Sequence, residues 1–331
     1  MHVRSGCTRR DFFRASCAAW VTLAGTGPAG AGRLWAARHQ KKIVTEEPWG
    51  RIEELADGVW ALVSTPLQDR RTLSNGAILA GRSRVVVIEA FGSTEGAAWL
   101  AAWARKLTGR AVDDVIVTHY HADHTAGISA FAGAGERPAS LRGTETTLDA
   151  IKQDDVRRNR SADAARNELL ISARRFDLTA PASIDLGGRT IHVIPRSGHT
   201  ASDVSIELDD PRIVIAGDLI WNRMFPNFVD AKPSELARSV WALGNTPAQT
   251  YVPGHGPLAD HAEYQRYVEL LNLVETAARA ANERGLPVAE AAKQFTLPAS
   301  LGEWHMFSPR YFEVAFNAWD KELRGTGTPR S

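Results

Sequence analysis

One short stretch decides the fold of this chain: Thr118-His119-Tyr120-His121-Ala122-Asp123-His124-Thr125-Ala126-Gly127. It follows the apolar run 115–117 and places three imidazoles and one carboxylate within six residues. In a strand, side chains 119, 121 and 123 would share one face and side chain 124 would point to the other, whereas in a helix 119 and 121 lie on nearly opposite sides. No single regular element gathers all four, so we expect a turn from a strand end into a helix start, with Asp123 or Thr125 as the N-cap.

Four titratable groups this close together point to a metal site. Burying them without partners would be costly, and a solvated loop is the alternative. Closely spaced imidazoles and carboxylates are typical of metal ligands, and a turn of this kind can wrap two ions. Three later Gly-containing segments also carry a histidine or an aspartate: His199 in Ser197-Gly198-His199-Thr200, Asp218 in Ala216-Gly217-Asp218, and His255 in Pro253-Gly254-His255-Gly256.

The pattern His119-x-His121-x-Asp123-His124 resembles the signature of the metallo-β-lactamase-fold hydrolase superfamily, which includes glyoxalase II-like thioesterases, lactonases and β-lactamases. The three later positions match that family's remaining ligands in the family's order, and the resemblance spans about residues 44–257. It implies an α/β fold of the four-layer αββα sandwich type, with the site along one edge. The ligand at position 218 is an aspartate, which is closer to the glyoxalase II pattern than to β-lactamases that use cysteine.

The resemblance also assigns the ligands. It implies that the first ion is held by His119, His121 and His199, that the second is held by Asp123, His124 and His255, and that Asp218 bridges the two. Ligation by imidazole and carboxylate alone suits two Zn²⁺ ions, and Fe or Mn also fit this class of site.

The expected reaction is hydrolysis of an ester, thioester, lactone or lactam by a hydroxide that bridges the metals. A bound metal lowers the pKa of water from ~15.7 to about 7, so no protein base is needed to form this nucleophile. Asp123 is the expected catalytic proton acceptor because it belongs to the second metal. The alternatives are a mononuclear-iron oxidoreductase similar to persulfide dioxygenases, a β-lactamase, and a binding protein that has lost turnover.

Substrate contacts are expected from the segment after Asp218, residues 219–230. It contains an apolar cluster of Trp221, Met224, Phe225 and Phe228, which either lines a pocket or packs in the core. Our substrate-binding candidates are Trp221, Phe225 and Tyr120. For Asn222, Arg223, His305 and Tyr311 the sequence favours surface or packing roles.

Glu89 ends the apolar strand 84–89, where the superfamily more often has an aspartate that orients a ligand histidine. A glutamate could do the same, since carboxylates fix imidazole tautomers, or it could be a solvated charge. The sequence leaves both roles open.

The periodicity around these motifs predicts the rest of the fold. Strand, helix and strand over residues 84–117 suggest an α/β sandwich, and a second β-rich half follows residue 181. The charged segment 139–180 predicts one or two amphipathic helices near the mouth of the site, whose arginines either face water, as we favour, or receive an anionic substrate. We expect one hydrolase domain over residues 40–331, of which 258–331 is a mainly helical extension.

Residues 1–31 read as a signal peptide. Thr8-Arg9-Arg10-Asp11-Phe12-Phe13 resembles a twin-arginine signal, and Ala29-Gly30-Ala31 resembles a cleavage site. The resemblance implies recognition by the twin-arginine export machinery and a periplasmic or secreted bacterial protein without a stable membrane anchor. Both cysteines, Cys7 and Cys17, lie in this leader, so the mature chain offers no thiolate ligand.

Composition limits the partners. The 331 residues carry a formal net charge of +1 and are 44% hydrophobic, which is typical of a globular protein. Removal of the leader takes away four arginines and one aspartate, which leaves 35 basic and 37 acidic side chains. This balance disfavours nucleic acid as a partner and leaves a small-molecule substrate as the expected one.

Overall fold

The structure is a computed structural model that describes residues 42–133, 137–177 and 179–325. The predicted signal peptide at 1–31, with its twin-arginine motif and both cysteines, lies outside the described residues. The predicted start of the domain at residue 40 also lies just outside them.

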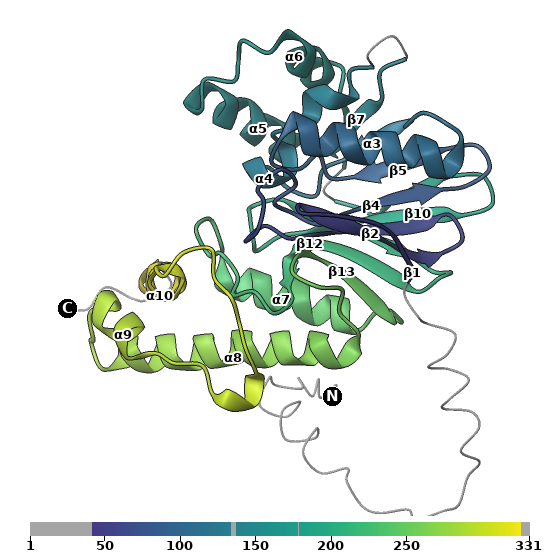
Figure 1. The fold of residues 1–331 in the computed structure, drawn as a ribbon. Coiled ribbons are helices and arrows are strands. Elements are labelled where there is room, and N and C mark those ends of the chain that lie inside the picture. Colours follow the sequence, from purple (N-terminus) through teal and green to yellow (C-terminus); the bar gives the residue numbers. More distant parts are fainter. Residues whose placement is uncertain (1–41, 134–136, 178, 326–331) are drawn as a thin grey trace, which may run out of the picture. The chain divides into compact units, whose positions relative to one another are not determined.

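The first half of the fold is an eight-stranded sheet whose outer face is covered by helices (Figure 1). Its strands follow sequence order: β1 (Lys42–Glu47), β2 (Gly50–Ala56), β3 (Val59–Ser64), β4 (Gly76–Ala80), β5 (Val85–Ile88), β6 (Asp114–Ile116), β7 (Ser140–Thr144) and β8 (Arg174–Phe176). The pairs from β1 to β5 are antiparallel, and those from β5 to β8 are parallel. The helix α3 (Thr94–Thr108) lies within the predicted strand-helix-strand segment 84–117, and it begins after Ser93 because the Ser93 hydroxyl accepts a hydrogen bond from the Gly96 amide.

The second half is a five-stranded sheet in the order β13-β12-β11-β10-β9. Its strands are β9 (Ala182–Asp185), β10 (Thr190–Arg196), β11 (Asp203–Leu208), β12 (Ile213–Trp221) and β13 (Thr250–His255). Among its four strand pairs, only the pair β12 and β13 at one edge is parallel. Two helices pack on its outer face, α7 (Pro233–Gly244) and α8 (His261–Glu283) (Figure 1).

Three apolar clusters hold four layers together. In β5, Val85 and Val87 face the cluster shared with α3, whereas Val86 and Ile88 face the cluster between the two sheets. This explains why the strand is apolar throughout, since both of its faces are covered. The third cluster joins the second sheet to α7 and α8. The predicted αββα sandwich is therefore confirmed.

The chain ends in a helical region, as expected. After α8 it forms α9 (Val288–Gln294), the short 3-10 helix η2 (Ala299–Leu301) and α10 (Tyr311–Gly325). Among the residues with described coordinates, no helix combines the length and the hydropathy needed to span a bilayer.

The charged segment 139–180 differs from the prediction. Its two helices, α5 (Glu145–Arg157) and α6 (Ala164–Ile171), are present, but the strands β7 and β8 flank them and extend the first sheet. Short charged strands escape a search for apolar periodicity, because β8 reads Arg-Arg-Phe and buries only its phenylalanine.

Candidate metal centre

The histidine-rich turn joins β6 to a single helical turn, α4 (Ala122–Thr125). The residue before this helix is His121, and no side chain caps it. The predicted N-cap at Asp123 or Thr125 is therefore wrong, since both residues lie inside the helix. The Thr125 hydroxyl instead donates back to the His121 carbonyl at 3.0 Å, which leaves the Asp123 carboxylate free to face the other ligands.

Three contacts fix the carbonyl groups of this turn. The Ser74 hydroxyl donates to Asp123 O at 2.8 Å, the Ala90 amide donates to His124 O at 2.8 Å, and Arg166 Nη1 donates to Thr125 O at 2.5 Å. The ligand side chains are thus held through their own backbone by the loop before β4, the loop after β5 and the helix α6.

The buried Asp203 carboxylate fixes the turn that carries His199. It accepts hydrogen bonds from the amides of His199 at 3.1 Å and Thr200 at 3.0 Å. The turn also needs Gly198, whose φ is +124° and whose added Cβ would lie 2.0 Å from the Leu236 amide nitrogen. His199 therefore leaves β10 in a fixed direction.

The remaining ligands come from the parallel pair β12 and β13, where Gly217 lies opposite Pro253. A Cβ at position 254 would lie 1.9 Å from Asp218 Oδ1, so glycine is needed for this approach. Asn75 holds the His255 loop, because its Nδ2 donates to Pro253 O at 2.9 Å and to Gly256 O at 2.7 Å. Sequence reasoning missed Asn75, whose only local signal is an Asn-Gly pair that also fits an ordinary turn.

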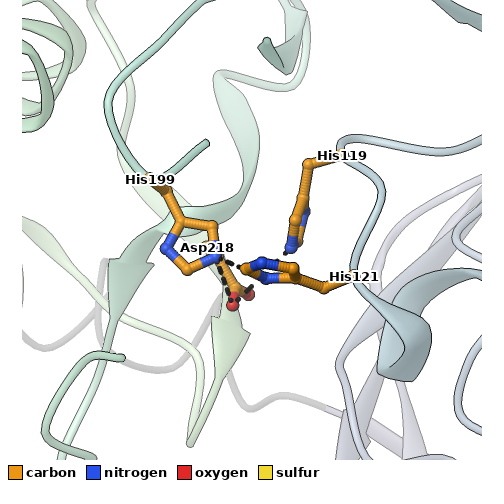
Figure 2. A group of neighbouring side chains, drawn as sticks. All are labelled: His119, His121, His199 and Asp218. Atoms are coloured by element: carbon orange, nitrogen blue, oxygen red, sulfur yellow. Dashed lines mark hydrogen bonds and ion pairs between the residues drawn. The ribbon is translucent and has the colours of Figure 1, made fainter. Parts of the chain in front are cut away.

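Four of the seven candidate ligands form the first group (Figure 2): His119, His121, His199 and Asp218. One possible ligand atom of each lies within 4.8 Å of the others. His199 Nε2 is 3.0 Å from His121 Nδ1 and 3.2 Å from Asp218 Oδ2. His119 Nε2 is 3.9 Å from the same carboxylate oxygen.

Asp123, His124 and His255 form a second group with the same 4.8 Å limit. His255 Nε2 is 3.2 Å from Asp123 Oδ2. Asp218 Oδ1 faces this group, at 3.0 Å from His124 Nε2 and 3.4 Å from His255 Nε2. Since Oδ2 faces the first group, the Asp218 carboxylate lies between the two.

Several buried polar atoms of the centre have no hydrogen-bond partner in the described chain: His119 Nε2, His124 Nε2, His255 Nε2 and Asp218 Oδ1. Leaving such atoms buried and unsatisfied costs free energy. Coordination to divalent cations would satisfy all of them, and neutral imidazole with carboxylate is a ligand set that zinc accepts. The residues present therefore fit two divalent ions.

Burial and neighbouring charges set the protonation of the candidate ligands. Burial lowers the pKa of His119 well below its usual value and that of His199 to about 3, so both rings are neutral. Burial also lowers the pKa of His255, but the nearby Asp218 outweighs it and raises the value to about 9. Burial raises the pKa of Asp218, but the neighbouring imidazoles outweigh it and hold the carboxyl well below its usual range. The Asp218 carboxylate is therefore ionised between the two groups of imidazoles.

The sequence matches the family model of the metallo-beta-lactamase superfamily over residues 70–266, which contain every candidate ligand. This chain belongs to that superfamily. A hydroxyacylglutathione hydrolase of Acidiphilium cryptum is 29% identical over 202 residues, which cover 60% of this chain and 72% of that protein.

Other superfamily relatives carry a different name. A metallo-beta-lactamase type 2 of a Bacillus species (strain 170) is 24% identical over 247 residues, which cover 71% of this chain and 88% of that protein. The solved metallo-beta-lactamase of Erythrobacter litoralis matches with a TM-score of 0.56 at 21% identity, covering 70% of this chain and 99% of that chain. At this identity the structural match supports the fold alone.

Glu89 contacts a candidate ligand of this superfamily member. It is buried, and its Oε1 lies 3.1 Å from His124 Nδ1. The Thr118 hydroxyl donates to the same oxygen at 2.5 Å and lies 3.0 Å from His119 Nδ1. The backbone φ of Glu89 is +76°, which is rare for a residue with a side chain and is found where the surrounding structure enforces it. Of the two roles left open by the sequence, the geometry favours orientation of a ligand.

Asp230 is a further carboxylate beside a candidate ligand, and sequence reasoning did not assign it a role. Its Oδ2 lies 2.9 Å from His121 Nε2 and accepts a hydrogen bond from the Tyr120 hydroxyl. The hydrogen bond from His121 lowers the pKa of Asp230 to about 2, so this carboxylate is ionised. Tyr120, a predicted substrate contact, therefore uses its hydroxyl to bind Asp230.

Replacing Asp230 with alanine is expected to weaken metal binding about 10- to 100-fold, because loss of such a partner frees the ligand ring to rotate. Competition with a chromophoric chelator measures this affinity. Asp209→Ala is the matched control, since Asp209 lies on an exposed loop and contacts His192 Nε2 at 3.2 Å, away from the centre. Equal affinities in the two variants would contradict the orienting role of Asp230.

Two other predicted substrate contacts lie in the core. Trp221 is 2% exposed, and its ring packs 4.0 Å from that of His255. Phe225 is fully buried, with its ring 4.9 Å from that of Phe312. Neither side chain presents surface to a substrate in this arrangement. Of the alternatives left open by the sequence, their burial favours packing.

Proposed function

We propose that this chain is a zinc-dependent hydrolase that binds two metal ions and cleaves an ester, thioester, lactone or lactam bond. The observation that carries the proposal is the Asp218 carboxylate, whose two oxygens face two separate groups of imidazoles. His119, His121 and His199 would hold the first ion. Asp123, His124 and His255 would hold the second, with Asp218 between them.

Divalent ions in these places would lower the pKa of water toward about 7 and polarise a substrate carbonyl. Asp123 is suited to take up and pass on a proton, because its side chain is 30% exposed whereas that of Asp218 is 2% exposed. Burial raises the pKa of Asp123, but His124 and His255 outweigh it and bring the value below the usual one. The carboxylate is therefore ionised and accessible to a substrate.

The names of the relatives support both a thioester and a lactam as substrates. The aspartate at position 218 favours a thioester or ester substrate over a lactam, because β-lactamases that use cysteine as a ligand lack this aspartate. A mononuclear-iron oxidoreductase would leave the complete second group without a role.

We also infer that the protein is exported. The support is the twin-arginine motif at Arg9-Arg10 and the predicted cleavage site ending at Ala31. The protein is then expected in the periplasmic or extracellular fraction of the cell, and recovery of the uncleaved chain from the cytoplasm alone would contradict this inference.

Metal analysis of the purified protein, joined to a panel of ester, thioester, lactone and β-lactam substrates, tests the proposed function. We expect two zinc ions per chain, and we expect hydrolysis to stop on chelation and to return on addition of zinc. One iron per chain with oxygen consumption on a persulfide would overturn the proposal. The absence of turnover on the whole panel by zinc-loaded protein would do so too.

A further inference from the structure

The C-terminal extension reaches the metal centre through residues 304–311. The His305 amide donates to Arg223 O at 2.9 Å, and the Phe225 amide donates to His305 O at 2.8 Å. These bonds attach the extension to the loop that follows β12, the strand that carries Asp218. The segment after His305 is therefore held beside the centre.

Phe307 lies directly against a candidate ligand. Its ring centre is 5.3 Å from that of His255 and 5.9 Å from that of Trp221, edge to face in both cases. Phe307 is partly exposed, whereas Trp221 is buried behind the same imidazole. Phe307 thus presents the aromatic surface that sequence reasoning expected from Trp221.

Tyr311, the first residue of α10, also lies near Trp221, with its ring 6.5 Å from that of Trp221. Phe307 and Tyr311 together form an aromatic wall next to Trp221. Burial, followed by the charges of Asp123 and Asp218, raises the pKa of Tyr311 to about 12. The hydroxyl therefore lies within the field of both carboxylates and keeps its proton. Within the described part of the chain it forms no hydrogen bond, so it is available as a donor.

The cations near this wall are engaged elsewhere. Arg223 Nε pairs with Glu263 at 3.0 Å, and Arg310 Nε pairs with Glu313 at 3.2 Å. Both acids neutralise the arginine beside them. Phe307 and Tyr311 therefore bring an aromatic face and a neutral hydroxyl, without an unpaired arginine beside them, and they offer little to a negatively charged substrate.

We propose that Phe307 and Tyr311 select the substrate of this centre. The inference rests on the proposed hydrolase function and narrows its substrate class to uncharged acyl compounds with an apolar chain or ring. The apolar group packs on Phe307, and the Tyr311 hydroxyl donates a hydrogen bond to a substrate oxygen. An acyl thioester of a charged peptide, such as a glutathione thioester, fits this wall poorly because its carboxylates would meet an aromatic surface.

The test uses the zinc-loaded full chain and a homologous series of straight-chain aryl esters, each paired with an ester of equal length that ends in a carboxylate. For the uncharged series we expect kcat/KM to rise about fourfold for each added methylene until the wall is covered. The carboxylate-ended esters are expected to be poorer substrates at every length. These measurements need no variant, so they decide the matter even if a substitution harms folding.

Two variants assign the effect to residues. Phe307→Leu should flatten the dependence on chain length, and Tyr311→Phe should lower kcat/KM about 5- to 10-fold across the series, the loss of one hydrogen bond. Metal content should not change in either. Phe295→Leu is the control, because Phe295 packs on Phe312 and Phe316 inside the extension.

The outcomes separate the two proposals. Ester hydrolysis with no dependence on chain length, or with a preference for the carboxylate-ended esters, would overturn the selecting role of the wall and leave the hydrolase intact. Failure to hydrolyse any ester, thioester, lactone or lactam would overturn the proposed function and, with it, the selecting role of Phe307 and Tyr311.

Discussion

Substitution of Asp218 by asparagine is expected to remove both metal ions and, with them, hydrolysis. The carboxylate is buried between the two ligand groups, at 3.2 Å from His199 Nε2 and 3.0 Å from His124 Nε2. Asparagine has almost the same shape, but it replaces one carboxylate oxygen with an NH2 group, which cannot coordinate a cation, and it removes the negative charge. Because loss of a supporting partner already costs about 10- to 100-fold in metal affinity, loss of this shared ligand should cost more than 100-fold.

The measurement is a zinc titration by chelator competition, together with the metal content after dialysis. His121→Ala is the informative comparison, since His121 belongs only to the first group and its loss should spare the second ion. Two tightly bound ions in Asp218→Asn would show that this carboxylate does not bridge, and loss of one ion alone would place it in a single group.

The ligands themselves could be predicted because their signals are local. His119, His121, Asp123 and His124 lie within six residues, and the three later ligands stand beside glycines that permit tight turns. The glycines matter physically, since residue 254 touches the Asp218 carboxylate and residue 198 needs a positive φ. Such close approaches leave a mark in the sequence at the position concerned.

The supports of the ligands could not be predicted, because their partners are distant in the chain. Asn75 holds a loop 178 residues away, and Asp230 meets His121 across 109 residues. Each is an ordinary polar residue in its own surroundings. Trp221 shows the same limit for apolar residues, since periodicity does not distinguish an exposed aromatic side chain from a buried one. Trp221 is buried, whereas Phe307 is the partly exposed ring beside His255.

Arg166 gives the clearest case of a support that the sequence does not reveal. Sequence analysis favoured a solvated face for the arginines of segment 139–180, yet the Arg166 side chain is 1% exposed and its Nε lies 2.6 Å from an Asp155 side chain that is 3% exposed. Its Nη1 also donates to Thr125 O, the carbonyl that follows the ligand His124. One guanidinium thus joins α5 and α6 to the turn that carries four candidate ligands.

Arg166→Met is accordingly expected to destabilise the chain by about 1–3 kcal/mol, because Oδ2 of the buried Asp155 carboxylate loses its hydrogen bond and only Arg160 Nε, 3.0 Å from Oδ1, still pairs with this group. Urea unfolding of the zinc-loaded and the chelated protein measures the change. Arg157→Met is the control, since the Arg157 side chain is 65% exposed and its pairing with Asp154 at 3.3 Å contributes about 0–1 kcal/mol.

The double variant Asp155→Leu/Arg166→Met separates the two roles of the arginine. It removes the buried carboxylate that lost the Arg166 hydrogen bond, so it should recover most of the stability lost in Arg166→Met. It should not recover metal affinity, because the Thr125 carbonyl still lacks its donor and the ligand turn is less firmly held. Full recovery of metal affinity in the double variant would mean that Arg166 only balances a charge and does not position the ligands.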